Sequence, residues 1–566
     1  MKLSRKLSLL RKIAAWRINW YKRTSIKAKG APENTLFCSA AEAVGLISNG
    51  HVLAVSGLGG NQHATPIYWA IHDAFLEKKA PNNLTVICIG GQGGRGKVPG
   101  TIDQLGMKGL CTRFVTGHME TFKNMLRLAD EGVMELQCVP QGTLALLCDA
   151  QANGRYTVSI STGLNTVFDP TIGRGTPLSG EGAEQWVETD GGLLKYTMPK
   201  IDVAIINAPA ADKEGNIYMT NTAMLAESRE IAKAARNHGG KVIVVVGKIV
   251  ETGYDKPYFT PNEIDAVVYD PSTGQTMGHS HENFNRNITL DCEVPLEEAI
   301  HELRWVNQLL GITPKRSELD KAMARLGASI FAQENKPCVL VNIGTGLPEE
   351  VCREIYEGGL LKDLTFFTES GVIGGVPGPG VFFGAAARPE SMVSSAEMFK
   401  RAHRELDVTI LGILEVDSQG NVNVSKRGEG FINYVGPGGF IDFSTSAKTV
   451  IFVGNWMARG KMEIENGTVK IVERGKPKFV ESVDEITFSG KQAIQDGRNV
   501  FYITHVGVFR LTARGLELIM VMPGIDIQAD ILDFSPAVIH LPEDGDVPIV
   551  DSSILSGVGY HLEMAP

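Results

Sequence analysis

The amino-acid sequence carries one pattern twice, about 205 positions apart. Each copy, at residues 202–217 and 407–422, has an apolar run that starts with aspartate and is followed by the turn pattern D-x-x-G-N. Repetition at one spacing indicates two related halves of about 200 residues or more each. Two further pairs match at spacings of 207 and 208 positions: residues 241–247 with 448–454, and residues 162–163 with 370–371.

Each half predicts alternating strands and helices. The apolar run at 241–247 (KVIVVVG) is typical of a core strand in a covered sheet, and residues 228–238 (SREIAKAARNH) have a helical pattern that ends at two glycines. Such alternation predicts an α/β fold with mainly parallel sheets covered by helices, an open α/β sandwich. The predicted division is a basic extension, an N-terminal α/β domain and a C-terminal α/β domain, at residues 1–34, 35–328 and 329–566.

Composition excludes several classes of protein. The net charge of −9 gives no electrostatic reason for nucleic-acid binding, and no uncharged apolar run approaches the ~18 residues that span a bilayer. The eight cysteines form no CxxC pair and no HExxH pattern occurs, so we expect no metal site and a reducing compartment. Residues 278–281 (GHSH) are interpreted as a solvated loop. Residues 90–97 (GGQGGRGK) lack P-loop spacing and predict a flexible loop near the mouth of the active site.

The first 30 residues differ from the rest of the chain. They contain ten Lys or Arg and no Asp or Glu, and Leu3, Leu7, Leu10 and Ala14 recur at helical spacing. Three interpretations stay open: a solvated basic extension, an amphipathic helix that binds a surface, or a mitochondrial targeting segment.

Glu369 stands where the two halves differ. At the spacing of 208 positions it replaces Ser161, it follows the apolar run 364–368, and glycines come soon after it. A carboxylate at the carboxyl end of a buried strand lies where α/β folds bind ligands. A solvated or helix-capping glutamate has the same sequence pattern, so position alone leaves both interpretations open.

The segments around Glu369 resemble a known family. Residues 368–377 (TESGVIGGVP) are similar to the (S/T)-E-[SNT]-G-x-x-G signature of the family I coenzyme A transferases. Residues 342–348 (NIGTGLP) and 436–442 (GPGGFID) are similar to two glycine loops of that family. The resemblance covers about residues 36–545 and points to the fused single-chain acetate/propionate CoA-transferases. Further segments that carry it lie at residues 140–144, 208–217, 486–491 and 523–526.

The resemblance implies a NagB/RpiA-like α/β fold and assigns roles to individual residues. Glu369 would be the covalent nucleophile, and Gln141 would bind a substrate carboxylate. Gly438 and Gly439 would donate backbone N–H groups to the oxyanion. Without the resemblance, Gly438, Gly439 and Gln141 are interpreted as turn residues. Lys461 and Arg459 are then interpreted as solvated surface charges. The CoA-binding residues would be Ile343, Gly344, Thr345, Gly346 and Leu347, with Lys461 or Arg459 at a CoA phosphate.

The function expected from this resemblance is reversible ping-pong transfer of CoA between short-chain acids such as acetate, propionate, butyrate or acetoacetate. Coenzyme A acts as the substrate carrier, and no permanently bound cofactor, nucleic acid or metal is expected. An acyl-CoA hydrolase and a non-enzymatic CoA-binding module are the alternatives. The loop at 56–61, Asn165 and Pro437 depart from the family pattern, which leaves the substrate less defined than the reaction.

Two expectations concern the assembly and its place in the cell. The resemblance implies a homo-oligomer. The expected compartment is the cytoplasm, or the mitochondrial matrix if residues 1–30 are a targeting segment. We expect no membrane contact apart from that of residues 1–30 with a surface.

Overall fold

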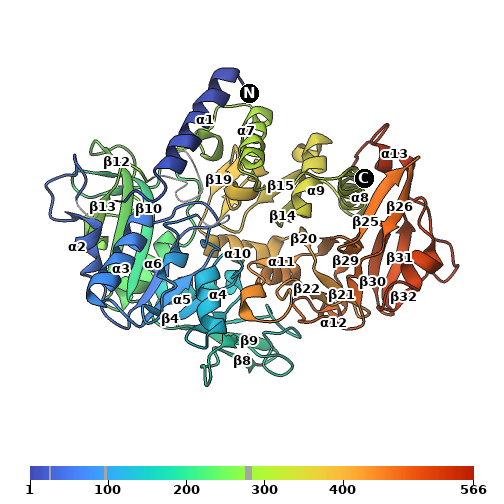
Figure 1. The fold of residues 1–566 in the computed structure, drawn as a ribbon, viewed down its shortest axis with the longest axis horizontal. Coiled ribbons are helices and arrows are strands. Elements are labelled where there is room, and N and C mark those ends of the chain that lie inside the picture. Colours follow the sequence, from blue (N-terminus) through green and yellow to red (C-terminus); the bar gives the residue numbers. More distant parts are fainter. Residues whose placement is uncertain (24–26, 95–97, 274–283) are drawn as a thin grey trace.

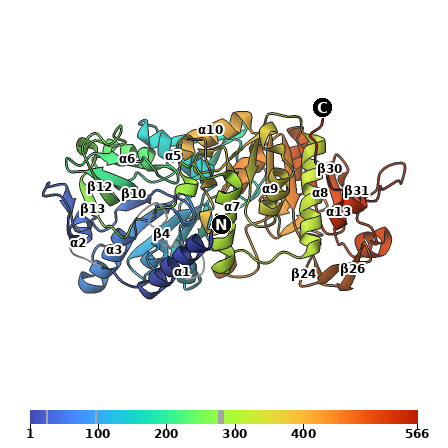
Figure 2. The same ribbon diagram turned by 90° about the horizontal axis from the view of Figure 1, so that it is seen from above.

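The computed structural model describes residues 1–23, 27–94, 98–273 and 284–566 and folds them into two halves that lie side by side (Figures 1 and 2). Each half is built on one large open sheet of ten strands with helices packed against it. The predicted α/β class with two mainly parallel, covered sheets is therefore confirmed. Within the described ranges, no helix combines the length and apolar composition needed to cross a bilayer.

The N-terminal sheet has the strand order β1-β13-β12-β10-β2-β3-β4-β5-β7, and β11 pairs with β10. Its neighbours are parallel except for β5–β7 and β10–β11. Parallel neighbours need crossover connections, which the helices between the strands supply. The strands are β1 (Phe37–Cys38), β2 (Val52–Val55), β3 (Leu84–Cys88), β4 (Cys111–Thr116), β5 (Glu135–Cys138), β7 (Pro177–Ser179), β10 (Val203–Asp212), β11 (Ile217–Tyr218), β12 (Lys241–Val250) and β13 (Ala266–Tyr269). The helices are α2 (Ala40–Val44), α3 (Thr65–Lys78), α4 (Lys123–Asp130), α5 (Gln141–Ala152) and α6 (Ser228–Asn237), and a small outer sheet holds β6 (Thr157–Ile160), β8 (Val187–Asp190) and β9 (Leu193–Thr197).

The C-terminal sheet has the order β19-β16-β15-β14-β20-β23-β29-β30-β31-β32. Its central run from β15 to β29 is parallel, and antiparallel pairs extend it on both sides, except that the edge strand β32 is parallel to β31. The strands are β14 (Val339–Ile343), β15 (Leu364–Phe367), β16 (Val372–Ile373), β19 (Ser391–Met392), β20 (Val408–Gly412), β23 (Thr449–Val453), β29 (Asn499–Ile503), β30 (Gly507–Thr512), β31 (Gly515–Val521) and β32 (Ile539–His540). The helices are α9 (Leu347–Glu357), α10 (Ser395–Glu405), α11 (Phe440–Ser446), α12 (Gly490–Gln495) and α13 (Ser552–Ser556). Shorter strands are β17 (Val376–Pro377), β18 (Ala386–Ala387), β21 (Glu415–Asp417), β22 (Val422–Asn423), β24 (Met457–Ala458), β25 (Lys461–Glu465), β26 (Thr468–Glu473), β27 (Lys476–Pro477) and β28 (Phe479–Val480).

The first aspartate of each repeat occupies the same structural position in both halves. Asp202 precedes β10, and its Oδ2 accepts a hydrogen bond from the N–H of Val52 on β2 (2.8 Å). Asp407 precedes β20, and its Oδ2 accepts from the N–H of Leu340 on β14 (2.9 Å). In each half the aspartate thus ties the start of one central strand to its parallel neighbour.

The second aspartate of each repeat closes the D-x-x-G-N turn. Asp212 Oδ1 accepts from the N–H of Asn216 (2.9 Å), and Asp417 Oδ1 accepts from the N–H of Asn421 (3.0 Å). The Asn side chain of each turn donates back to the other oxygen of the same carboxylate. The sequence repeat therefore corresponds to a repeated local structure as well as a repeated strand order.

The connection between the halves packs on the C-terminal one. Helix α7 (Leu296–Leu309) contacts β18 and the short 3-10 turn Gly380–Phe382, and helix α8 (Glu318–Glu334) contacts α9, α13 and β23. The break in the sequence pattern at 333–337 marks the end of α8. We propose that the C-terminal domain begins after β13, with residue 284 already on its side, in place of the predicted division at 328/329.

The N-terminal extension forms one helix, α1 (Leu3–Ile18), beside α7 (Figures 1 and 2). Arg5 forms an ion pair with Glu302 of α7 (2.6 Å), and Leu9 is fully buried. Beyond the helix, Arg23 pairs with Asp73 of α3 (2.9 Å). The extension is thus attached to both halves, which a freely solvated segment would not be.

The Asp417 turn gives a stability prediction. The change Asp417→Ala removes the acceptor of the Gln419 and Asn421 N–H groups, and a buried donor without a partner costs about 1–3 kcal/mol. We expect the free energy of unfolding, measured in urea, to fall by about 2 kcal/mol. The control Asp544→Ala, in an exposed turn, should change it by less than about 0.5 kcal/mol. Equal stability of Asp417→Ala and the wild type would contradict this structural role.

Candidate active site

A cavity of about 370 Å³ lies between the two halves and is lined by residues of both. Its walls include the carboxyl ends of β14, β15 and β20, where a parallel sheet binds ligands. The N-terminal half contributes the glycine-rich loops after β2 and β3 and the start of α5. Predicted site residues on its wall are Gln141, Gly344, Thr345, Leu347, Glu369, Gly438 and Gly439.

Glu369 lies just beyond the carboxyl end of β15 and is only 8% exposed. Removal from water disfavours the ionised carboxylate and raises the pKa of Glu369 to about 7; the amide of Gln141 opposes this rise and the negative charge of Asp442 adds to it. The hydroxyl groups of Thr368 and Ser370, on either side, both donate to the Gly384 carbonyl. These two bonds fix the turn that carries the carboxylate.

Gln141 begins α5 and lines the cavity beside Glu369. Its Nε2 atom is buried and makes no hydrogen bond of regular geometry with any residue that the structure describes. The next residue, Gly142, donates its N–H to Asp442 Oδ2 on α11 (2.9 Å). A Cβ at position 142 would lie 2.6 Å from Asp442 Cγ and 2.4 Å from Phe399 Cδ1, so a larger residue would push α5 and α11 apart.

The loop before α11 is hydrogen-bonded to the other half through its backbone. Met119 N–H donates to the Val435 carbonyl (2.7 Å), Gly438 N–H donates to the Gly117 carbonyl (2.8 Å), and Gln141 N–H donates to the Gly438 carbonyl (3.0 Å). The three bonds place this loop directly beside the start of α5. The two predicted binding elements, Gln141 and the glycine loop, therefore form one wall.

This arrangement changes the predicted role of Gly438. Its N–H already donates to Gly117, so it is not directed at the cavity as an oxyanion donor. Gly439 forms the N-cap of α11 and also lines the cavity, which keeps its N–H as the candidate donor. Gly436 serves packing, because a Cβ there would lie 2.5 Å from the Gly117 oxygen and its φ is +73°.

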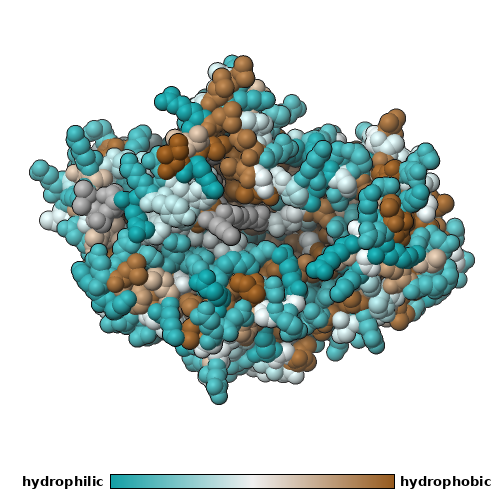
Figure 3. All heavy atoms as spheres, viewed as in Figure 1, coloured by the Kyte–Doolittle hydropathy of each residue, from teal (hydrophilic) through white to brown (hydrophobic). Residues whose placement is uncertain are grey.

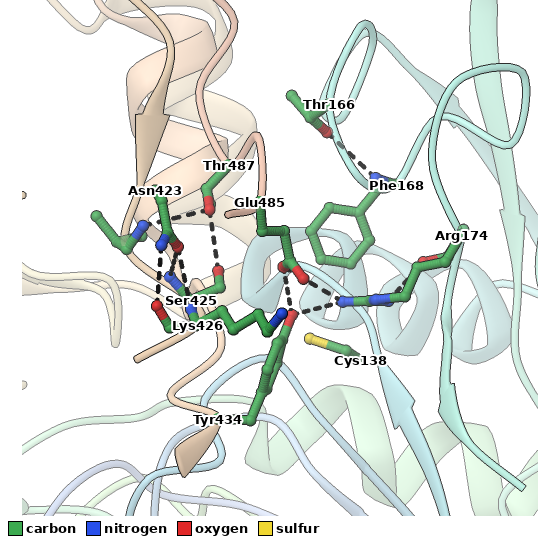
Figure 4. A network of polar contacts seen from close by, with 12 residues as sticks. Cys138, Thr166, Phe168, Arg174, Asn423, Ser425, Lys426, Tyr434, Glu485 and Thr487 are labelled. Carbon is green, nitrogen blue, oxygen red and sulfur yellow. Dashed lines mark hydrogen bonds and ion pairs between the residues drawn. The ribbon is translucent and has the colours of Figure 1, made fainter. Parts of the chain in front are cut away.

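A buried polar network lies behind this loop (Figure 4). Tyr434, which precedes the loop, donates to Glu485 Oε1 (2.6 Å) and accepts from Arg174 of the N-terminal half. The Arg174 guanidinium is 3.6 Å from the same carboxylate and lies over the Phe168 ring. Beside it, burial raises the pKa of the Cys138 thiol to about 12. Removing one partner of such a pair leaves an uncompensated buried charge, so the network resists separation of the halves.

Comparison with known proteins identifies the family. The sequence pattern of the family described as "Coenzyme A transferase" matches residues 37–263. A caffeate CoA-transferase of Acetobacterium woodii is 31% identical over 545 residues, covering 92% of this chain and 97% of the relative. The chain belongs to the coenzyme A transferase family. The acetate CoA-transferase YdiF of Escherichia coli (strain K12) is 32% identical over 515 residues, covering 88% and 92%.

A solved structure agrees with this assignment over most of the chain. The acyl-CoA transferase YdiF of E. coli O157:H7, crystallised as a thioester complex with CoA, matches with a TM-score of 0.81 and 29% identity. The match covers 94% of this chain and 98% of that one. The resemblance to the fused single-chain family I enzymes is confirmed, and the protein is a CoA-transferase.

The predicted CoA-binding residues separate into two groups in this CoA-transferase. Gly344, Thr345 and Leu347 line the cavity. Ile343 is buried in β14 and Gly346 is the N-cap of α9 with φ +88°, so both support the loop without lining the cavity.

The two predicted phosphate ligands lie elsewhere. Arg459 is exposed on the turn before β25, and Lys461 on β25 pairs with Glu463 (3.2 Å). Neither residue lines the cavity, so the structure gives no support to these two assignments.

Two cations that sequence analysis missed do line the cavity. Lys478, before β28, donates to the Ile413 carbonyl (2.9 Å), and burial lowers the pKa of its ammonium to about 8. Arg427 forms an ion pair with Glu120 of the other half. Lys478 lies between β23 and β29, in a stretch much longer than the corresponding one between β12 and β13 of the N-terminal half. Because that half has no residue at an equivalent position, comparison of the two repeats could not point to Lys478.

The remaining sequence predictions concern loops. Gly91 and Gly94 line the cavity, in agreement with a loop near its mouth, whereas residues 95–97 and 278–281 lie outside the described residues. In the described part of the chain, no group of three or more His, Cys, Asp or Glu could hold a metal ion.

The buried network gives a prediction about the glycine loop. The change Tyr434→Phe keeps the ring and removes the hydroxyl that joins Arg174 to Glu485, so we expect the free energy of unfolding to fall by about 1–3 kcal/mol. The turnover number should fall as well, because Tyr434 positions the loop before α11. Urea unfolding and steady-state kinetics measure the two effects. The exposed Tyr156→Phe is the control, and equal effects of both changes would argue against a special role of the network.

Proposed function

We propose that this CoA-transferase moves CoA reversibly from a short-chain acyl-CoA to a free carboxylic acid, through a covalent thioester on Glu369. The observation that carries the proposal is the buried carboxylate of Glu369 on the cavity wall, beside the buried amide of Gln141 and in a cavity that a glycine loop also lines. The CoA thioester complex of the related YdiF supports a covalent intermediate of this kind.

The proposed reaction has two halves. In the first, an oxygen of ionised Glu369 attacks the acyl carbonyl of acyl-CoA and CoA leaves as thiolate, which gives a mixed anhydride. The thiolate then attacks the Glu369 carbonyl and releases the free acid, so that CoA is held as a glutamyl thioester. A second acid reverses these steps. No general base is needed, because the nucleophile reacts as a carboxylate.

Each attack creates a negative oxygen that needs a donor. We assign this role to the Gly439 N–H and to Gln141 Nε2, which is buried beside the Glu369 carboxylate. Donors that are fixed in place before the reaction are typically worth about 100- to 1000-fold in rate each.

The cavity also offers surfaces for CoA. We propose that Gly344, Thr345 and Leu347 contact the pantetheine arm, since glycine lets a narrow chain approach the backbone. Lys478 and Arg427 replace Lys461 and Arg459 as candidate cations for a CoA phosphate. Cations can neutralise phosphate charge and donate hydrogen bonds at the same time.

The acyl substrate is proposed from the class of short acids: acetate, propionate, butyrate or acetoacetate. The relatives are named for acetate and for caffeate, a larger aromatic acid. Phe383, Phe440 and Phe443 line the cavity and give the acyl group apolar contacts. Self-association and a cytoplasmic site of action stay predictions.

The nucleophile is tested by trapping. After incubation with acetyl-CoA, intact mass should show a CoA adduct, and borohydride reduction with peptide mapping should place it on Glu369. The change Glu369→Gln should abolish the adduct and lower kcat by at least about 1000-fold, whereas Glu481→Gln, at an exposed site, should retain both. Added acetate or propionate should discharge the adduct. Equally fast discharge by water would indicate a hydrolase instead.

The raised pKa of Glu369 gives a prediction for pH. Because burial raises that pKa to about 7, the ionised fraction and the rate of adduct formation should fall about tenfold per pH unit below 7 and level off above it. The change Asp442→Asn removes a neighbouring negative charge that raises this pKa, so the midpoint should move to lower pH. Single-turnover rates across pH 5–9 measure it, with Asp496→Asn as an exposed control. An unchanged midpoint in Asp442→Asn would refute the coupling.

A further inference from the structure

Helix α1 has two apolar stripes on different faces. The first contains Leu9, which is fully buried, together with the half-buried Ile13 and Trp16. On the same side, two hydrogen bonds join the Arg5 guanidinium to the carboxylate of Glu302 on α7 (3.0 and 2.6 Å). This stripe fixes the helix to the body of the protein.

The second stripe of α1 faces solvent. Leu3, Leu7, Leu10, Ala14 and Ile18 follow one another at intervals of three or four residues, so they lie on one face of the helix. The four large side chains among them are 72, 58, 41 and 83% exposed. In the space-filling view, apolar side chains run along the projecting part of the surface where Figure 1 places α1 and α7 (Figure 3). A continuous exposed apolar stripe marks an interaction site more often than scattered single residues do.

Cations border this stripe. By helical spacing, Lys6 and Arg17 lie along one side of it and Arg11 along the other. The whole segment of 30 residues contains ten Lys or Arg and no acid, although the chain as a whole carries 55 Lys or Arg against 64 Asp or Glu. The remaining residues therefore have an excess of 19 acids, and positive charge is concentrated at the apolar stripe.

The apolar stripe and its bordering cations together favour an anionic lipid surface as the partner of α1. A symmetric contact between two copies of α1 would bring two strongly basic segments together, which like-charge repulsion opposes. An anionic lipid surface matches both features, since headgroups attract the cations and the acyl boundary takes up the apolar side chains. We propose that α1 is an interfacial helix that docks this enzyme on an anionic membrane surface, with the Leu3–Ile18 stripe immersed and the body of the protein in water.

Flotation of the full-length protein with lipid vesicles tests the proposal. We expect binding to vesicles of phosphatidylcholine with about one third phosphatidylglycerol, and much weaker binding to pure phosphatidylcholine. Binding should weaken when salt is raised from about 0.05 M to about 0.5 M, because screening shortens the reach of the charges. Absence of binding to the anionic vesicles at low salt would overturn the proposal.

Variants of α1 separate the contribution of its apolar side chains to vesicle binding from that of its cations. Replacing the four large apolar residues of the stripe should weaken vesicle binding on the order of 100-fold or more, and replacing the three bordering cations by Gln should weaken it on the order of 100-fold. Acyl-CoA transfer in solution should be unchanged, which distinguishes loss of docking from misfolding. The apolar variant is Leu3→Ser, Leu7→Ser, Leu10→Ser and Ile18→Ser, and the charge variant is Lys6→Gln, Arg11→Gln and Arg17→Gln.

A matched control removes the same number of exposed apolar side chains elsewhere and should bind vesicles like the wild type. Equal loss in the control would show that general surface apolarity, and not α1, causes binding. Size-exclusion chromatography in the absence of lipid tests whether a second copy of the chain binds the apolar stripe. If the wild type is an oligomer and the apolar variant is dissociated, the stripe is a contact between copies and the proposal is overturned. The control variant is Leu290→Ser, Val538→Ser, Ile549→Ser and Val558→Ser.

Discussion

Backbone hydrogen bonds between the loop at 435–438 and the segment at 117–141 hold the two halves against each other at the cavity. Glu369 comes from one half and Gln141 from the other, so neither half alone contains the site. The bonds use N–H and C=O groups, which every residue has, but they need the chains to approach closely. Gly436 and Gly142 allow that approach, since a Cβ at either position would collide with the opposite half.

Burial is the main cause of the raised pKa values of the carboxyl groups at and near the cavity. Burial raises the pKa of Glu369 and of Asp442 to about 7, and it raises that of Glu227, which lies near Glu369, to about 8. A carboxylate that has lost its water is costly to ionise, and the same loss of solvation leaves it a stronger nucleophile once it is ionised. Hydrogen bonds limit the rise of two of these pKa values. The Gly142 N–H donates to Asp442, and the Ser395 hydroxyl donates to Glu227.

The sequence alone predicted the paired halves, because the spacing of Asp202 and Asp407 reflects a strand start that both sheets need. It could not predict which glycine N–H groups face the cavity, since the N–H of Gly438 is taken by Gly117, more than 300 residues away. Lys478 lies in an insertion of the second half, where the repeat gives no guide. The proposed shift of the domain boundary has a related reason: α8 ends in a polar break in the sequence, yet the helix packs on β23 of the C-terminal sheet.

Helix α7 connects helix α1 with the wall of the cavity. Its Glu302 holds Arg5 of α1, and one and a half turns later its Asn307 bonds to the Pro379 carbonyl (2.8 Å) and the Val381 N–H (2.9 Å). Val381 is part of the cavity wall. One helix therefore contacts both the N-terminal helix and the cavity wall, and its two contact residues, Glu302 and Asn307, are only five positions apart.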